Sequence, residues 1–549
     1  MAQRLARARL RVKSEDARGT FLKMPSLNTT PATPVAHESQ KFRSQMGQIS
    51  RHSSVYFAGT MFSAGAGYVF KVYLARVLGA EALGLYALGM TIIGFVGVFK
   101  GFGLPQAAVR FVASYNATSR YEELRAFIFR AVGLLLAANA LLGVLVIIVG
   151  PWVAEHLYHA PALSPYLGLF ALIMIFGTLT TFFGQVLQGY KDVSRRTVIN
   201  NFIGSPVVMT FTVILVTLGM GLRGYILAQV LCAVTILTLM LAAVWNSTPP
   251  AARTLSFQLP PFPREVISFS AAVYGIDFLR FLLSQSDKVL IGMFLGPREV
   301  GIYAVSIAIV MYVAIVLQSV NQIFSPTIAE LHSSGQHALL GRLFQTLTKW
   351  IIGLTLPVAS VVIIFARPIM SMFGRDFESG WPILIVGTLG QLVSCGVGSV
   401  GFLLLMSGNQ NRLIRVQMVM TVVMVGLGLL LIPHWGIFGA AVAAAITTAG
   451  TNLWNLQQVR SALRLSPYNR SYVHLVLPII AMLAVILATR MLLPIVHPQW
   501  LVVGLAGLLS YAAFLGTVLA FGLDPDDRLI LDAVRQKGRL AFKKGMQEP

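Results

Sequence analysis

Apolar runs of membrane-spanning length recur along nearly the whole chain, and they restrict its possible folds more than any other feature. A helix that crosses the hydrocarbon core of a bilayer needs about 20 apolar residues. Runs of that kind lie near 55–78, 82–104, 125–149, 165–188, 199–219, 224–245, 265–295, 299–322, 346–366, 381–406, 412–433, 436–458, 473–494 and 499–522. They predict an all-α polytopic membrane protein with about fourteen transmembrane helices.

Composition agrees with this prediction and excludes several classes of function. Only 11% of the residues are charged, whereas a soluble domain carries about 25%. The net charge of +22 lies in the tails and short loops, without an aromatic-interleaved basic face, so we expect attraction to anionic lipids and no nucleic-acid partner. Short loops, no phosphate-binding GxxxxGK[ST] motif and no cluster of His and Cys predict that the chain is not an enzyme and holds no metal or cofactor.

The distribution of basic residues over the loops predicts the orientation. With the N-terminus inside, the cytoplasmic loops hold fifteen Lys and Arg and the opposite loops hold five. By the positive-inside rule, both termini are cytoplasmic, and the protein is expected in the cytoplasmic (inner) membrane of the cell. The five outer residues are Arg76, Arg223, Arg298, Arg367 and Arg375.

An internal repeat divides the chain. Residues 71–87 (KVYLARVLGAEALGLYA) match residues 288–304 (KVLIGMFLGPREVGIYA) at seven of 17 positions, at a constant offset of 217. The offset covers six spans, so the copies share one orientation, which is typical of transporters built of two rocking lobes. Each copy is expected to turn at a Leu-Gly pair outside the membrane.

The repeat and a proline-rich join set the expected domain boundaries. The segment 246–263 contains five prolines, which forbid a continuous helix. We therefore expect two pseudo-symmetric six-helix lobes followed by two additional helices. The expected parts are a disordered basic tail over 1–52, an N-lobe over 53–245, a linker over 246–263, a C-lobe over 264–460, the last two helices within 461–522 and a basic tail over 523–549.

The segments LGAEALGLYALGMTI, DKVLIGMFLGPREVGIYAVSIAI and FSPTIAELHSSGQHALLGRLFQ resemble the polysaccharide transporter family. That family contains O-antigen-type oligosaccharide flippases and belongs to the multidrug/oligosaccharidyl-lipid/polysaccharide superfamily. The resemblance implies a V-shaped, MATE-like bundle that moves an undecaprenyl-pyrophosphate-linked glycan outward by alternating access. It also leaves a second function open, cation-coupled multidrug extrusion with H⁺ or Na⁺ as the coupling ion.

Charged residues inside spans are candidates for the transport path, because they are costly in lipid and face a cavity. Asp277, Arg280, Asp287 and Lys288 share one stripe of the seventh span. Arg280 is a candidate for the phosphate head group and Asp277 and Asp287 for charge pairing or ion coupling, with a purely structural ion pair as the alternative. The repeat mates Lys71 and Lys288 are expected to flank the outer side of the cavity or to extend to the interface. Lys100, near the inner end of the second span, is a candidate for a phosphate contact at the cytoplasmic entry, with a plain positive-inside role as the favoured alternative.

Amide side chains in the spans are candidates for sugar contacts. They fit sugar hydroxyls and equally fit hydrogen bonds between helices. Asn139, Gln391 and Asn452 belong to this set, and its strongest candidates are Gln185, Gln188, Gln318 and Asn321.

Overall fold

The structure is a computed structural model, and it describes residues 34–190, 192–253, 264–267, 270, 285–496 and 498–521. The chain divides into two compact units, residues 1–54 and 55–549, and all packing described below lies within the second. In the described ranges every regular element is a helix. The predicted all-α class is thus confirmed.

The first half of the chain contributes seven described helices, joined by short 3-10 and π-helical turns. They are α1 (Pro34–Val96), α2 (Leu104–Ala117), α3 (Tyr121–Trp152), α4 (Leu167–Gly189), α5 (Val193–Thr197), α6 (Ser205–Leu215) and α7 (Gly221–Ser247). Residues 34–54 form the beginning of α1, and the tail predicted over 1–52 stays a prediction. No proline follows Pro34 in that stretch, so nothing in its composition breaks a helix.

The second half contributes nine described helices. They are α9 (Pro297–Val313), α10 (Ile315–Ser333), α11 (His337–Ile364), α12 (Ala366–Ser371), α13 (Trp381–Val397), α14 (Val400–Met406), α15 (Gln410–Leu463), α16 (Val476–Arg490) and α17 (Gln499–Phe521). Residues 285–294 are also helical and lead into the turn before α9.

Nine helices in the described ranges are long and apolar enough to cross a membrane, or ten if the bent pair Pro297–Val313 and Ile315–Asn321 forms one span. Three of the nine contain a glycine with positive φ, namely Gly79, Gly219 and Gly436. Helix α15 has 54 residues, or about 80 Å of helix against a bilayer core of about 30 Å. The backbone at Gly436 is not helical (φ 59°, ψ −142°), and this break divides α15 into two helices. The count of fourteen spans stays a prediction.

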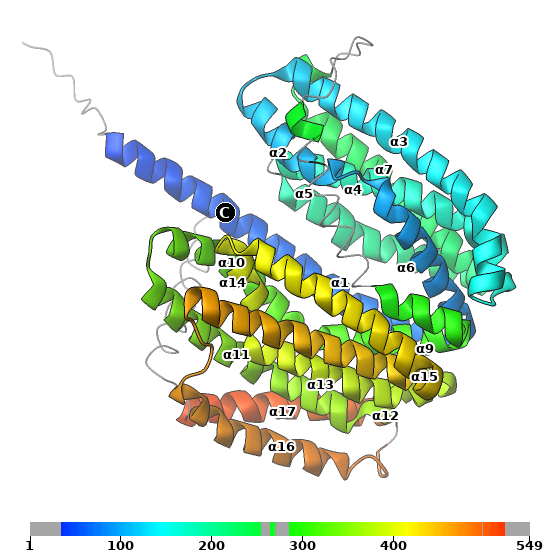
Figure 1. The fold of residues 1–549 in the computed structure, drawn as a ribbon, viewed down its shortest axis with the longest axis vertical. Coiled ribbons are helices and arrows are strands. Elements are labelled where there is room, and N and C mark those ends of the chain that lie inside the picture. Colours follow the sequence, from blue (N-terminus) through cyan, green and yellow to red (C-terminus); the bar gives the residue numbers. More distant parts are fainter. Residues whose placement is uncertain are drawn as a thin grey trace, which may run out of the picture. The chain divides into compact units, whose positions relative to one another are not determined.

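The helices pack in two groups and a pair. Helices α2, α3, α4, α6 and α7 contact one another, α9 to α15 contact one another, and α16 packs on α17 and α11. Figure 1 shows the first group in cyan and teal, the second in green to orange-yellow, and the pair α16 and α17 in orange and red. This is the predicted arrangement of two lobes with two additional helices, although the exact domain boundaries stay predictions.

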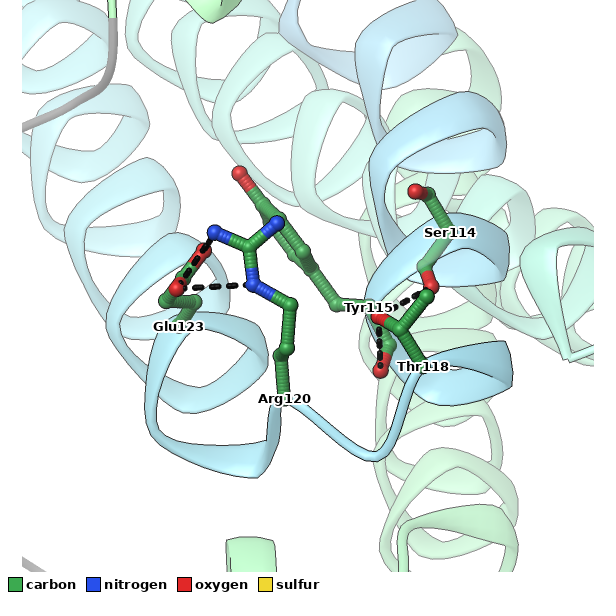
Figure 2. Close-up of polar contacts among 5 residues, drawn as sticks. All are labelled: Ser114, Tyr115, Thr118, Arg120 and Glu123. Atoms are coloured by element: carbon green, nitrogen blue, oxygen red, sulfur yellow. Dashed lines mark hydrogen bonds and ion pairs between the residues drawn. The ribbon is translucent and has the colours of Figure 1, made fainter.

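Helix α2 forms where the sequence predicted only a loop. Its buried face includes Ala107, Phe111, Val112 and Tyr115, which pack onto α4 and α3. The turn into α3 is closed locally, as Figure 2 shows: the Thr118 hydroxyl donates to the Ser114 carbonyl oxygen (2.9 Å), and the Arg120 guanidinium pairs with Glu123 and lies over the Tyr115 ring. Short amphipathic helices of this length fall below a search for 20-residue apolar runs.

Candidate functional site

The two copies of the repeat meet each other directly. Gly79 and Gly296, which are repeat mates, both have positive φ (78° and 111°) and nearly extended ψ (175° and −179°). After these turns, the backbones touch: a Cβ on Gly84 would lie 1.6 Å from the Pro297 carbonyl oxygen, and a Cβ on Gly301 would lie 2.0 Å from the Ala80 carbonyl oxygen. Because 80 pairs with 297 and 84 with 301 at the offset of 217, this contact is reciprocal, as expected about a two-fold axis. We call it the outer contact, after the side of the membrane on which the repeat turns are predicted.

A side-chain contact lies near the outer contact. The Arg76 Nε donates to the Met372 carbonyl oxygen at 2.7 Å and so ties α1 to the segment after α12. A further backbone approach joins the halves at Gly103, where a Cβ would lie 2.2 Å from the carbonyl oxygen of Ser270. The two halves therefore touch near the repeat turns and again near the start of α2.

A large cavity lies between the two halves. Its volume is about 1330 Å³, and residues from α1, α2, α4 and α7 line it together with residues from 285–288, α9, α10, α13 and α15. The charged residues among the described lining are Lys71, Lys100, Asp287 and Lys288. Three lysines and one carboxylate give this lining a positive balance. All four were candidates from the sequence.

Neither ammonium of the lysine mates pairs with a carboxylate in the described part of the chain. The Lys288 Nζ donates to Gln285 Oε1 at 3.0 Å, and the Lys71 Nζ lies 5.7 Å from the centre of the Tyr312 ring. An amide oxygen and an aromatic face orient a cation without neutralising it. Both lysines belong to the described lining of the cavity.

Asp287 accepts hydrogen bonds from two uncharged donors. Its Oδ1 accepts from the Lys288 backbone amide at 2.8 Å, and its Oδ2 accepts from the Tyr303 hydroxyl at 2.9 Å. Tyr303 is fully buried and fixes the carboxylate in one place. The carboxylate is thus held beside Lys288 in the cavity wall, where the two opposite charges also attract each other.

The four amide side chains predicted to contact sugar lie in different surroundings in the structure. Gln318 lines the cavity. Asn321 lies one turn further along α10, and its Oδ1 is buried without a hydrogen-bond partner. Gln185 and Gln188 instead accept from the Arg196 guanidinium at 3.3 and 2.5 Å, away from the described cavity lining.

Two sequence candidates, Asp277 and Arg280, lie outside the described residues. The structure adds residues that the sequence did not single out: the rings of Tyr86, Tyr225, Tyr303 and Tyr312 line the cavity, as does Gln285. Tyr86 and Tyr303 are repeat mates, so the repeat was the signal that could have found them. Within the described ranges, no three His, Cys, Asp or Glu side chains gather as metal ligands would.

Several solved structures share this fold. The lipid II flippase MurJ in an inward closed conformation matches 84% of the chain and 97% of its own length at 15% identity, with a TM-score of 0.66. An inward-facing multidrug resistance transporter of the MATE family matches 75% of the chain and 99% of its own, at 15% identity and a TM-score of 0.59. At these identities the likeness shows the fold.

Sequence comparisons agree with the fold. A family model described as polysaccharide biosynthesis protein matches residues 49–332, and a model described as MatE matches residues 276–435. The uncharacterized membrane protein MJ1068 of Methanocaldococcus jannaschii is 22% identical over 426 residues, which cover 72% of this chain and 80% of that protein.

Together, the apolar spans and these comparisons define a multi-pass membrane protein with the fold of the flippase and transporter structures named above. The chain belongs to the polysaccharide biosynthesis protein family, whose model matches more than half of its 549 residues.

Proposed function

We propose that this protein flips a polyprenyl-pyrophosphate-linked oligosaccharide across the cytoplasmic membrane by alternating access. One observation carries the proposal: a cavity of about 1330 Å³ lies between the two halves, and its described lining contains three lysines and one carboxylate. A pyrophosphate needs unpaired cationic donors, and a glycan needs volume and polar groups. The cavity lining offers both, with Gln318, Gln391 and Asn452 among its polar side chains.

The mechanism needs no covalent chemistry. The head group occupies the cavity while its lipid tail stays in the bilayer, and the lobes over 53–245 and 264–460 rock about the linker over 246–263. With both termini in the cytoplasm, a potential that is negative inside favours outward movement of an anion by about 2.3 kcal/mol per charge per 100 mV. Opening outward then requires separation of the outer contact at Gly84 and Gly301.

Roles for the two acids and the arginine of the seventh span belong to the same proposal. Arg280 supplies a bidentate guanidinium to the pyrophosphate. Asp277 and Asp287 balance the cavity charge or couple transport to H⁺ or Na⁺. Support for Asp287 comes from its place in the cavity wall next to Lys288.

One observation favours a second function, cation-coupled multidrug extrusion. Asp287 lies in the cavity wall, and the MatE model matches the surrounding segment 276–435. A carboxylate can bind a cationic drug or a coupling ion. The excess of lysines over carboxylates in the described lining disfavours this function, because it repels cationic drugs.

Reconstitution into liposomes tests the proposal. The purified protein should translocate undecaprenyl pyrophosphate that carries a fluorescent sugar, and it should not export the cation ethidium. Transport of ethidium without transport of the lipid probe would establish the second function instead. Lys71→Gln with Lys288→Gln is the matched inactive variant.

A further inference from the structure

The helix that follows the first repeat turn breaks at Lys100. Helix α1 ends at Val96, a 3-10 turn covers Gly97–Lys100, and Phe102 and Gly103 adopt positive φ (46° and 69°) before α2 begins. The Leu104 amide donates to the Gly101 carbonyl oxygen at 2.8 Å. It is therefore not available to the Lys100 carbonyl four residues earlier, as it would be in a continuous helix.

A buried side chain takes the place of that lost amide. The Asn139 Nδ2 donates to the Lys100 carbonyl oxygen at 2.9 Å, and the Thr178 hydroxyl donates to Asn139 Oδ1 at 3.0 Å. Asn139 is 1% exposed and Thr178 is 2% exposed. Burying two polar side chains and holding Phe102 at positive φ both cost free energy. The break is thus built and anchored by α3 and α4.

The Lys100 side chain also has a defined course. A Cβ on Gly97 would lie 3.2 Å from its Cδ and 3.5 Å from its Nζ, so the chain folds back over Gly97. Lys100, Gly97, Gly101 and Gln106 all line the cavity. Since its Nζ lies over Gly97, which is itself in the cavity wall, the ammonium of Lys100 lies at the cavity.

Depth separates Lys100 from the other two lysines. Lys71 and Lys288 each precede their turn glycine by eight residues, which is about 12 Å of helix, whereas Lys100 follows Gly79 by 21 residues, which is about 30 Å on the returning helix. Gly79 divides α1 into two helices, and the repeat analysis predicts that the chain turns back there. Lys100 therefore lies about one bilayer core away from the outer turns, where the phosphates of the other leaflet lie.

We propose that Lys100 forms a second anion subsite, which captures the pyrophosphate of the lipid-linked substrate at the inner leaflet before Lys71 and Lys288 receive it deeper in the cavity. This inference rests on the proposed function. Asn139 and Gly97 are positioning residues, because the first holds the Lys100 backbone and the second leaves room for its side chain.

A kinetic test separates capture from later steps. Liposomes of phosphatidylcholine and phosphatidylglycerol contain the protein and undecaprenyl pyrophosphate carrying one fluorescent sugar. Lys100→Gln should raise KM about tenfold, since one charge-assisted contact is lost, and leave kcat within about twofold. Lys71→Gln should lower kcat instead. Lys100→Arg, which keeps the charge, should restore KM to within about threefold.

Gly97→Val tests the placement of the ammonium without removing its charge. The added side chain displaces the Lys100 Cδ and Nζ, so KM should rise as in Lys100→Gln. Arg298→Gln is the matched control: it removes one positive charge from an exposed arginine that pairs with Asp376, and it should leave KM unchanged. Thermal unfolding of each purified variant identifies those that fail to fold.

Two results would overturn the subsite: an unchanged KM in both Lys100→Gln and Gly97→Val, or a fall in kcat alone in Lys100→Gln. A wild-type protein that does not translocate the probe would instead contradict the proposed function. In that case, equilibrium binding of the same probe to detergent-purified protein decides the subsite. Tenfold weaker binding of the probe to Lys100→Gln than to the wild-type protein would support the Lys100 subsite, and equal binding would contradict it.

Discussion

The two copies of the repeat, 71–87 and 288–304, have the same backbone and different surroundings. In both, a lysine precedes a positive-φ glycine by eight residues, a second glycine forms the outer contact five residues later, and a tyrosine faces the cavity two residues after that. The shared positions thus build the closure between the halves and place two cations at equal distances from it.

The copies differ in what holds those side chains. In the second copy, the Tyr303 hydroxyl donates to the carboxylate of Asp287. In the first copy, the position that matches Asp287 is Phe70, which has no carboxylate. Tyr86, the mate of Tyr303, instead packs its ring against the ring of Tyr225, with the ring centres 4.7 Å apart. The symmetric residues set the geometry of the cavity, and the asymmetric ones set its local chemistry. The four predictions below test that division.

Gly84→Ala should have the largest effect of the four changes, by opening the outer contact that the two copies of the repeat form. The new Cβ would lie 1.6 Å from a backbone oxygen, and no side chain can move aside, so we expect a cost of about 3 kcal/mol or more against the closed outer contact. Ala304→Cys, a cavity position, should then react with a membrane-impermeant thiol reagent added outside cells. Gly133→Ala is the control, because nothing lies within 4 Å of its Cβ. Wild-type labelling of Gly84→Ala would show that the outer contact is not a gate.

Lys71→Gln combined with Lys288→Gln comes next. Loss of two charge-assisted contacts of about 1.5 kcal/mol each predicts a transport rate about 100-fold lower. The measurement is flipping of the fluorescent lipid pyrophosphate in liposomes. If the two lysines act as a symmetric pair, the single variants should be equally impaired. A tenfold difference between the transport rates of the two single variants would show that the different surroundings of the two lysines, and not their symmetric positions, determine their roles.

Tyr303→Phe and Tyr86→Phe probe the asymmetry directly. Tyr303→Phe removes the hydrogen bond to Asp287 and should lower the free energy of unfolding by about 2 kcal/mol, because a buried carboxylate loses a donor. Tyr86→Phe keeps the ring contacts with Tyr225 and should change stability less. Thermal unfolding of the two purified variants compares them, and equal shifts would contradict the assigned role of Asp287.

Arg76→Gln should have the smallest effect. The Arg76 side chain is exposed and donates one hydrogen bond to the Met372 carbonyl oxygen, which is worth about 0.5 kcal/mol. Its mate in the second copy is Met293, which has no such donor. Labelling of Ala304→Cys should rise slightly, by about twofold. A rise as large as that of Gly84→Ala would make the arginine, and not the glycine pair, the main closure.

Much of the fold could be predicted from the sequence, because lipid restricts a chain more than water does. Backbone groups in hydrocarbon must bond within the chain, so long apolar runs can only be helices, and the offset of 217 fixed the pairing of the two halves. Lys71, Lys100, Asp287 and Lys288 could be found in the same way, since charges in spans face a cavity. All four line it.

Only the tertiary structure decided which polar groups serve the cavity and which serve the fold. Gln185 and Gln318 are both glutamines within apolar spans. In the structure, Gln185 accepts a hydrogen bond from Arg196, whereas Gln318 lines the cavity. The sequence did not distinguish Asn139 from the other amides in the spans. In the structure, its Nδ2 donates to the Lys100 carbonyl oxygen at the helix break. The role of an amide side chain depends on hydrogen-bond partners that are distant in the sequence. The free-energy cost of leaving an apolar helix in water depends only on the residues of that helix. For this reason the spans can be read from the sequence, while the roles of single amides required the packed structure.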